Sequence, residues 1–249
     1  MMQNANVFKR TEMKFLIRED QAMRLREVMA PVMEGDSYGR STILSLYYDT
    51  PDYRLIRRSI EKPDYKEKLR VRSYGVATPK SNVFIELKKK YQKTVYKRRI
   101  SMKEQDAGQY LSEPANRMSN LYHAGRNTQI LKEIDYFQQF YRELRPSVLI
   151  SCEREAFFGK EDSDLRITFD RNILWRTEKL SLCAGIYGEA LLENGYVLME
   201  VKTKDAIPLW LVRFFGEENI YKTSFSKYGT AYQRMQENRR EKERKVGIA

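Results

Sequence analysis

Three positively charged residues recur at every second position in the stretch KEKLRVRSYG, residues 66–75. Lys68, Arg70 and Arg72 alternate there with aliphatic residues. Side chains of a β-strand alternate between its two faces, so the three cations would project from one face and the aliphatic residues from the other. Lys and Arg side chains can neutralise and hydrogen-bond the oxygens of phosphate groups. The first chemistry that this stretch suggests is therefore binding of a polyanion.

The same alternation returns in five further segments, each with charged residues on one face of a predicted strand. The sets that share a face are Arg10, Glu12 and Lys14; Glu86, Lys88 and Lys90; Lys97 and Arg99; Arg166, Thr168 and Asp170; and Glu200, Lys202 and Lys204. An ordinary antiparallel sheet with one face in water would also produce this pattern. Like charges at neighbouring positions of one face repel, and this favours a face that binds an anion.

Eight strands and four helices are predicted to position these residues. The strands lie at residues 8–17, 43–49, 67–74, 83–90, 93–102, 146–157, 165–171 and 196–204. Apolar spacing predicts helices at 19–30 and 128–141, a third after Pro208, and a fourth from near Ser226 into a charged, solvated tail from about residue 234. Residues 112–127 are predicted to form a loop. No linker divides the sequence, so residues 1–249 are predicted to form one domain.

The composition narrows the class of protein. A formal net charge of +12 at pH 7 indicates a polyanionic partner, although a generically basic protein would have the same charge. Cys152 and Cys183 lack disulfide or zinc-site spacing, which fits a reducing cytoplasm. The single histidine, His123, argues against a zinc site, a catalytic triad or a Cys–His pair. No apolar run has the length of a signal peptide or membrane helix, so we expect a soluble cytoplasmic protein.

The apolar faces of the helices require cover, and the aliphatic faces of the strands can provide it. The charged faces then lie either in bulk water or opposite one another, and eight strands are enough to close a barrel. We therefore predict an α+β fold: an eight-stranded antiparallel β-barrel that forms a tunnel with a charged interior, with helices packed outside. Charges inside a tunnel are costly unless a ligand matches them, so a polyanion is expected to run through it.

Several motifs, taken together and in order, resemble those of one known superfamily. They are YYDTPDYRL at 47–55, the KxRxR of Lys68, Arg70 and Arg72, the ExK of Glu86 and Lys88, and the late LMEVK followed by FSKYGTAY. The chain resembles the CYTH, or triphosphate tunnel metalloenzyme, superfamily, and within it the polyphosphate polymerase (VTC) domain, over Phe8 to Tyr232. The resemblance implies an eight-stranded antiparallel tunnel that binds the triphosphate of ATP together with a divalent cation, Mn²⁺ or Mg²⁺.

The resemblance also implies roles for individual residues. The implied catalytic cations are Lys68, Arg70, Arg72, Lys88, Arg166 and Lys202, and the implied further phosphate ligands are Lys14, Lys97, Arg99, Arg154, Ser226 and Lys227. Glu200 is the implied metal ligand, assisted by Glu12 and Glu86. Ser226 and Lys227 stand where the last helix begins, and a helix N-terminus favours anions.

Two positions depart from the pattern of the superfamily. Its opening ExExK reads RTEMK here, with Arg10 in place of the first glutamate, and this weakens the case for a triphosphatase. Arg154 shares its strand parity with apolar residues, so either a β-bulge shifts the register or the assignment is wrong. The YYD of residues 47–49 is left outside the predicted site, because a strand that ends in a Pro turn, with Asp49 as a cap, accounts for it equally well.

These features predict a metal-dependent ATP–polyphosphate phosphotransferase. The end of a phosphate chain attacks the γ-phosphoryl group of ATP, and no general base is required because the attacking oxygen is already ionised. Two alternatives are open: a tripolyphosphatase or nucleoside triphosphatase of the same fold, and a non-catalytic module that binds polyphosphate or RNA. The predicted partners are ATP and inorganic polyphosphate or pyrophosphate. Nucleic acid and a membrane segment are not expected, and the oligomeric state is left open.

Overall fold

The computed structural model of the protein describes residues 11–92, 94–112, 128–204 and 206–246. Four features of the sequence analysis lie outside these residues: Arg10, the start of the first predicted strand, most of the predicted loop at 112–127, and His123.

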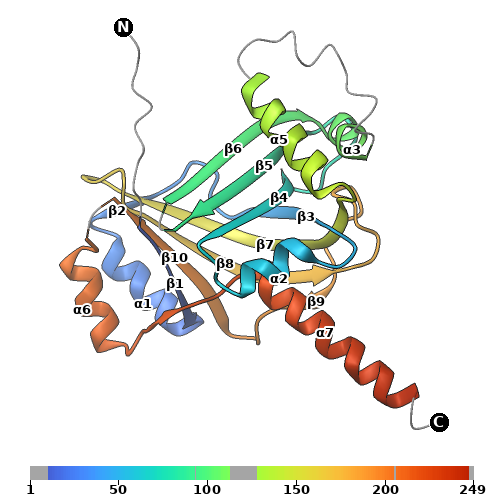
Figure 1. The fold of residues 1–249 in the computed structure, drawn as a ribbon. Helices are drawn as coiled ribbons and strands as arrows, with labels where there is room; N and C mark the ends of the chain where they lie inside the picture. Colours follow the sequence, from blue (N-terminus) through green and yellow to red (C-terminus); the bar gives the residue numbers. More distant parts are fainter. Residues whose placement is uncertain (1–10, 93, 113–127, 205, 247–249) are drawn as a thin grey trace, which may run out of the picture. The chain divides into compact units, whose positions relative to one another are not determined.

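The described chain forms an antiparallel sheet and six helices (Figure 1). The strands are β1 (Thr11–Arg18), β2 (Met33–Gly35), β3 (Ser41–Asp49), β4 (Tyr65–Tyr74), β5 (Asn82–Tyr91), β6 (Thr94–Lys103), β7 (Arg145–Gly159), β8 (Arg166–Arg176), β9 (Glu189–Ala190), β10 (Tyr196–Thr203) and β11 (Lys222–Thr223). The helices are α1 (Glu19–Met29), α2 (Arg54–Ile60), α3 (Glu104–Ser112), α5 (Thr128–Tyr141), α6 (Leu209–Glu217) and α7 (Lys227–Val246).

All eight predicted strands are present, as β1, β3 to β8 and β10. The four predicted helices are also confirmed, as α1, α5, α6 and α7. The prediction omitted the three strands of only two or three residues, β2, β9 and β11, and the short helices α2 and α3. Strands of two or three residues are too short for a periodic pattern to stand out.

A closed eight-stranded barrel is not confirmed. The sheet has 11 strands in the order β11-β1-β10-β8-β7-β3-β4-β5-β6, with β2 on β7 and β9 on β8, and this order ends at β11 and at β6. The coarser prediction holds: an antiparallel sheet with helices packed on its apolar faces.

The chain divides into two compact units. Unit 1 comprises the chain up to Ser41, Cys152–Ile173 and Leu192–Phe225, and unit 2 comprises Thr42–Ser151, Leu174–Leu191 and the chain from Ser226. Strands β7 and β8 contribute a segment to each unit. That residues 1–249 form one domain stays a prediction.

In unit 1, helices α1 and α6 cover the apolar face of β1 and β10 (Figure 1). Ala22, Leu25 and Met29 recur at helical spacing along α1 and are buried in this core. Phe15 of β1 packs against Phe215 of α6, with ring centroids 4.5 Å apart. The charged residues of β1 and β10 alternate with the apolar residues of the same strands. The helices therefore lie on the face opposite to the charges.

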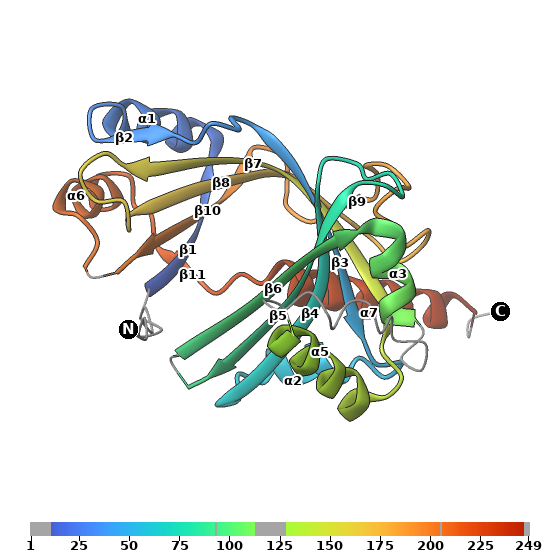
Figure 2. The same cartoon turned by 90° about the horizontal axis from the view of Figure 1, so that it is seen from above.

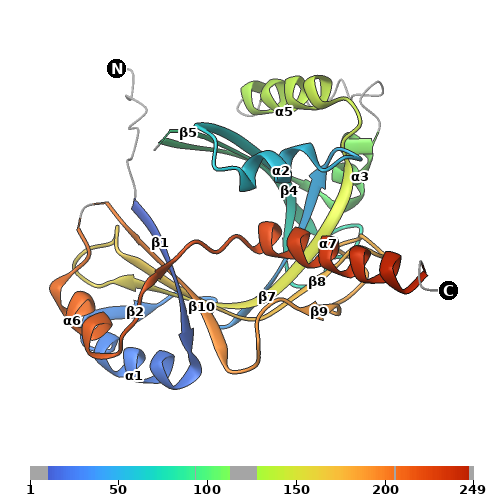
Figure 3. The same ribbon diagram turned by 60° about the horizontal axis from the view of Figure 1, so that its bottom comes forward.

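In unit 2, helices α3 and α5 cover the apolar face of β4 to β6, and Figure 2 shows α5 running alongside these strands. Leu69, Val71, Ile85 and Leu87 are all buried in this core. In Figure 3, helix α7 lies next to α2, and the ring of Tyr53 just before α2 contacts a tyrosine of α7. The far end of α7 is exposed, as predicted for the charged tail.

No described helix has the length and apolar composition needed to cross a lipid bilayer.

A buried hydrogen bond joins helices α3 and α5 in the core of unit 2, and its contribution to stability can be tested. Tyr110 of α3 donates its hydroxyl to Asp135 of α5 at 2.7 Å, and both residues are buried. Replacing Tyr110 with Phe is expected to lower the free energy of unfolding by about 1–3 kcal/mol, because a buried acceptor loses a donor. Tyr136→Phe on the exposed side of α5 is the matched control and is expected to change nothing. Urea denaturation of the two variants measures the difference, and equal stabilities would contradict the assignment.

Candidate functional site

The predicted site residues fall into two clusters, one in each unit. The unit 1 cluster contains Glu12, Lys14, Arg154, Arg166, Glu200 and Lys202, and the unit 2 cluster contains Lys68, Arg70, Arg72, Glu86, Lys88, Lys97, Arg99, Ser226 and Lys227. The role of each residue in binding or catalysis stays a prediction, whereas its surroundings within its unit follow from the structure.

In the unit 2 cluster, strand pairing sets like charges directly opposite one another. Lys68 of β4 pairs with Lys88 of β5, and Lys88 pairs with Lys97 of β6, so three lysines occupy one row across three strands. Opposed like charges destabilise a sheet. A row of this kind is favourable when an anion lies against it, because the anion replaces repulsion with attraction.

The carboxylate of Glu86 lies among the unit 2 cations with its side chain only 1% exposed. Nε of Arg70 and Nε of Arg99 each donate to it at 2.7 Å, and Nζ of Lys97 lies at 2.8 Å. Burial by itself would raise the pKa of Glu86, but Arg70, Arg72 and Lys97 outweigh burial and hold it well below its usual range. Glu86 is therefore ionised, and it acts as the counter-ion that fixes the surrounding guanidinium and ammonium groups.

Tyr47 belongs to this cluster, although the sequence analysis left it out. It lies opposite Arg70 in the sheet, and Nη1 of Arg70 donates to its hydroxyl oxygen at 3.1 Å. Its ring stacks on Tyr228 at a centroid distance of 4.8 Å. The alternation along β3 puts Tyr47 on the face opposite to the core residues Leu46 and Tyr48. That parity was the signal in the sequence that could have identified Tyr47.

Asp49 acts as the cap that the sequence analysis considered. Its carboxylate accepts the backbone N–H groups of Leu55 and Ile56 at the start of α2, at 2.8 and 3.0 Å. The hydroxyl of Tyr228 donates to the same carboxylate at 2.8 Å. Burial raises the pKa of Asp49, while these hydrogen bonds act in the opposite direction. Asp49 thus connects α2 with the start of α7.

Ser226 joins the start of α7 to the unit 2 cluster. Its hydroxyl accepts Nζ of Lys68 at 3.1 Å and the backbone N–H of Gly229 at 3.2 Å, so it caps the helix. A Cβ at position 229 would lie 3.1 Å from the Cβ of Ser226, which is a tight contact. Lys227 is the first residue of α7 and is partly exposed. The N-terminus of a long helix thus lies beside a lysine of the row, an arrangement that favours anions.

In the unit 1 cluster, acidic and basic residues pair across β1 and β10. Glu12 lies opposite Lys202, and Lys14 lies opposite Glu200. Nζ of Lys202 lies 2.5 Å from Glu200 and 3.9 Å from Glu12, so this one ammonium group contacts both carboxylates. Burial acts to raise the pKa of Glu200, but Lys202, Lys14 and Arg154 outweigh burial and lower the pKa to about 2. Glu200 is therefore ionised at neutral pH.

Arg154 lies on the charged face without any need for a bulge. Its guanidinium binds Asp170 of β8 in a bidentate pair at 2.5 and 2.6 Å. Burial acts to lower the pKa of Arg154, but Asp170 raises it above its usual value. The assumption that residues of its parity in β7 form the core face was wrong, because Leu149 and Phe157, of the opposite parity, pack on the cores of the two units. Five consecutive residues of β7 are buried, so burial on both faces erased the alternation.

Two further cations of unit 1 are held by neighbouring groups. Nζ of Lys14 donates to the backbone carbonyl of Phe225 at 3.0 Å, directly before Ser226 in sequence. The guanidinium of Arg166 lies 4.8 Å from the centre of the Phe158 ring, at cation–π distance. Both side chains are therefore oriented by contacts within unit 1.

The residues of unit 1 fit a divalent cation better than Glu86 does. Glu12 and Glu200 bring two carboxylates to one ammonium group, and carboxylate oxygens are the ligands that Mg²⁺ and Mn²⁺ prefer. Thr168, opposite Glu200 in the sheet, has a buried hydroxyl without a hydrogen-bond partner. Among the described residues, no three acidic, histidine or cysteine side chains form a group that could hold a metal ion. Glu200 shares its ammonium group with a second carboxylate, Glu12. Glu86 is instead a single carboxylate that contacts Arg70, Arg99 and Lys97 within 2.8 Å, and we assign it to holding these cations.

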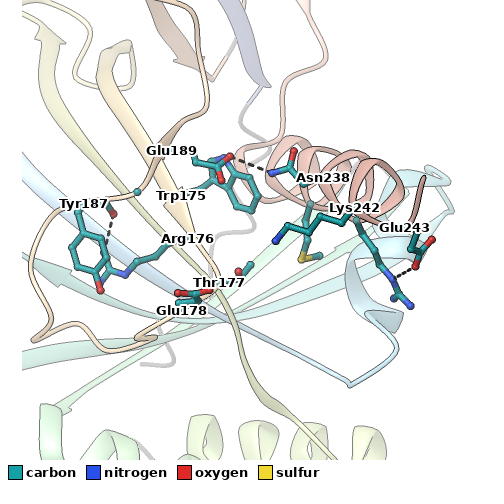
Figure 4. A pocket seen from close by; sticks show the side chains of 12 residues that line it. Trp175, Arg176, Thr177, Glu178, Tyr187, Glu189, Asn238, Lys242 and Glu243 are labelled. Carbon is teal, nitrogen blue, oxygen red and sulfur yellow. Dashed lines mark hydrogen bonds and ion pairs between the residues drawn. The ribbon is translucent and has the colours of Figure 1, made fainter. Parts of the chain in front are cut away.

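One pocket, of about 530 Å³, lies in unit 2 away from the predicted residues (Figure 4). It is lined by residues of β8, β9 and α7, among them Trp175, Tyr187 and Lys242. Arg176 in its wall donates to the backbone carbonyls of Gly185 and Tyr187, so this arginine stabilises the loop between β8 and β9. The pocket contains none of the predicted site residues.

Comparison with known proteins gives a direct family match. The VTC domain family matches residues 9–236. Subunit 4 of the vacuolar transporter chaperone complex of Trypanosoma brucei brucei is 28% identical over 159 residues, which are 53% of this chain and 19% of that protein. The match thus spans about a fifth of the length of that curated relative.

Two solved structures were compared with the chain, and the first of them shows a similar fold at low sequence identity. A candidate adenylate cyclase from Bacillus halodurans is 13% identical with a TM-score of 0.51, over 86% of this chain and 92% of that chain. A candidate adenylyl cyclase from Hippeastrum, described as having a dominant triphosphatase activity, is 15% identical with a TM-score of 0.49, over 88% and 93% of the two chains.

The family match covers almost all of the described residues and agrees with the motifs in the sequence. The resemblance to the VTC domain is confirmed, and the chain belongs to the VTC domain family.

Proposed function

We propose that the protein transfers the γ-phosphoryl group of ATP to the end of an inorganic polyphosphate chain. The observation that carries this proposal is the unit 2 cluster. A row of three lysines crosses its strands, and Arg70, Arg72 and Arg99 form ion pairs with the carboxylate of Glu86. Membership of the VTC domain family supports the same conclusion. A face with this excess of fixed positive charge suits a ligand with many phosphate groups.

We extend the proposal to the architecture. The eight long strands enclose the phosphate chain in a tunnel lined by their charged faces where these occur, and residues 1–249 form one domain. The presence of all eight strands supports this view, and so does the confinement of the helices to their apolar faces.

Within this proposal, the residues of the chain act by position and charge. The unit 2 cations bind the phosphate oxygens and neutralise the charge that the transition state spreads over them. Glu200 and Glu12 would hold a divalent cation, Mn²⁺ or Mg²⁺, which polarises phosphoryl oxygens when bound. The attacking group is a phosphate oxygen that is already ionised, so no side chain has to remove a proton.

Incubation of the purified protein with ATP and Mn²⁺ tests the proposal. A ladder of polyphosphate on a gel, with internal-phosphate signal in the phosphorus NMR spectrum, is the expected result. Release of orthophosphate without chain growth would show a triphosphatase instead. Intact ATP together with tight binding of polyphosphate would show a binding module, and either outcome would contradict the proposed transferase.

Adjacent arginines on opposite faces of β6 give a matched test of the phosphate-binding face. Arg99 belongs to the unit 2 cluster, whereas Arg98 donates to Glu133 of α5 on the other face. Arg99→Ala is expected to weaken tripolyphosphate binding about 10- to 100-fold, because a charge-assisted contact is lost. Arg98→Ala removes the same charge and is expected to have an effect of less than about threefold. Isothermal titration measures both affinities, and equal losses would show that only net charge matters.

A further inference from the structure

We propose that the Tyr47 hydroxyl is a proton-linked positioning group of the unit 2 cluster: as a neutral phenol it leaves the charge of Arg70 to the phosphate chain, and as a phenolate it competes with that chain. This inference rests on the proposed function, since it concerns the same anion site. It adds a residue that the motifs alone did not assign to the site.

The ring of Tyr47 is held in one place. It stacks on Tyr228 at 4.8 Å with an interplanar angle of 23°. The hydroxyl of Tyr228 in turn bonds Asp49 at 2.8 Å and Ser147 at 2.9 Å. Tyr47 itself is only 7% exposed. Its hydroxyl therefore stays beside Arg70 and cannot turn away into water.

Arg70 is shared between two oxygen partners. Nη1 donates to the Tyr47 hydroxyl at 3.1 Å, and Nε donates to Glu86 at 2.7 Å. Arg70 keeps its charge, but one carboxylate already offsets part of it. If the second partner also becomes negative, the positive potential that Arg70 presents to a ligand falls further. The protonation state of Tyr47 therefore decides how much positive charge Arg70 offers to a ligand.

Charged groups on several elements face Tyr47. Lys68, Arg70 and Arg72 approach from β4, Glu86 lies beyond Arg70 on β5, and α7 contributes Tyr228 with Asp49 behind it. Burial acts to raise the pKa of Tyr47, but Arg70, Lys68 and Arg72 outweigh it and lower the pKa to about 8. Tyr47 thus ionises much closer to neutral pH than an ordinary tyrosine does.

Phosphate binding and ionisation of Tyr47 must then oppose each other. A bound polyanion adds negative charge beside the hydroxyl, which raises its pKa, so binding above about pH 8 drives the reaction Tyr47–O⁻ + H⁺ → Tyr47–OH with a proton from the solvent. By the same linkage, the part of the affinity due to Tyr47 falls about tenfold between about pH 7 and about pH 9.

The test uses the full chain, with Tyr47→Phe as the main variant and two tyrosine controls. Phe keeps the stacking on Tyr228 and removes only the hydroxyl. Tyr48→Phe is the matched control, because Tyr48 faces the apolar core and burial raises its pKa to about 12. Tyr74→Phe controls for the second tyrosine near the cations, whose pKa Arg99 lowers against the effect of burial.

Two measurements decide the question. The first is the ultraviolet difference absorbance of tyrosinate during a pH titration without ligand, where one group that ionises near pH 8 is expected to vanish in Tyr47→Phe and to persist in both controls. The second is titration calorimetry with tripolyphosphate at about pH 9 in buffers of different ionisation enthalpy. Wild type and both controls are expected to take up a proton on binding, and Tyr47→Phe is expected to take up less. The fall of about tenfold in tripolyphosphate affinity between about pH 7 and about pH 9 is also expected to be absent in Tyr47→Phe.

Each outcome separates this inference from the proposed function. If wild type and Tyr47→Phe show the same absorbance titration, or bind with the same pH dependence and proton uptake, the role of Tyr47 is wrong while the anion site stands. If no protein binds tripolyphosphate at any pH, the proposed function fails and the role of Tyr47 falls with it. All measurements compare folded proteins. A variant that melts at the temperature of the assay is therefore measured at a lower temperature.

Discussion

Replacing Glu200 with Gln is expected to lower the turnover of ATP on the order of a thousandfold while tripolyphosphate still binds. The glutamine has the same shape but cannot supply the negative charge that a divalent cation requires. In the wild type, Lys202, Lys14 and Arg154 keep the pKa of Glu200 at about 2 against the effect of burial, so its carboxylate is ionised throughout the neutral range. Removing a negative charge from a basic site leaves the attraction for phosphate unchanged or stronger.

The readouts for this variant separate catalysis from binding and folding. Turnover comes from ADP release, phosphate affinity from calorimetry, and Mn²⁺ binding from electron paramagnetic resonance, in which the variant is expected to bind less metal. Glu34→Gln changes the charge equally at an exposed position of unit 1 and is expected to behave as wild type. Glu12→Gln provides a second test, because Glu12 contacts the same ammonium group of Lys202. Full turnover in both Glu200→Gln and Glu12→Gln would refute the assignment of the metal to these carboxylates.

Replacing Glu86 with Gln is expected to lower the free energy of unfolding by about 1.5–3 kcal/mol, because partly exposed cations lose their buried counter-ion. Arg70, Arg99 and Lys97 each contact this carboxylate within 2.8 Å. Urea denaturation at about pH 7 measures the loss. Glu61→Gln, at an exposed position of unit 2, is the control for the change in charge and is expected to have little effect.

The stability lost in Glu86→Gln has a defined pH dependence. The folded-state pKa of Glu86 lies below its ordinary value of 4.5, so its contribution to stability is fully present above about pH 4.5 and is lost as the pH falls through the lower folded-state value. The difference in stability between wild type and Glu86→Gln is therefore expected to shrink on acidification below about pH 4.5. A difference that stays constant down to acid denaturation would show that Glu86 contributes by packing and not by charge.

Added phosphate offers a second check on Glu86. If its loss leaves cations without a counter-ion, tripolyphosphate should raise the melting temperature of Glu86→Gln more than that of the wild type, because the ligand replaces the missing negative charge. An equal rise in both proteins would mean that the cations rearrange towards solvent in the variant.

Backbone geometry explains why the strands could be predicted so fully. Side-chain direction alternates along any strand. In a sheet with one apolar face and one charged face, apolar and charged residues therefore alternate in the sequence with a period of two. The strand face on which Arg70, Lys88, Lys97 and Glu200 lie could therefore be predicted from the sequence alone. The helices α1 and α5 were readable for the same reason, from the spacing of apolar residues on one face.

The failures occurred where this local pattern is missing or uninformative. Strand β7 is buried on both faces along its middle, so parity assigned Arg154 to the wrong face. Its pair with Asp170 places it on the charged face. Strands β2, β9 and β11 are too short to show any period. The positions at which the sheet order ends depend on pairing between distant segments, and the predicted barrel assumed a closure that no local pattern contains.

The sequence by itself determined the eight long strands, the charged face of six of them, and through its motifs the VTC domain family. Only the tertiary structure decided which charges meet: that Lys68, Lys88 and Lys97 share one row, that Glu86 serves as counter-ion to the arginines, and that Tyr47 stands beside Arg70. The physical reason is that alternation follows from the local geometry of one strand. The strand register and the electrostatic environment of each group arise from contacts between residues far apart in the chain.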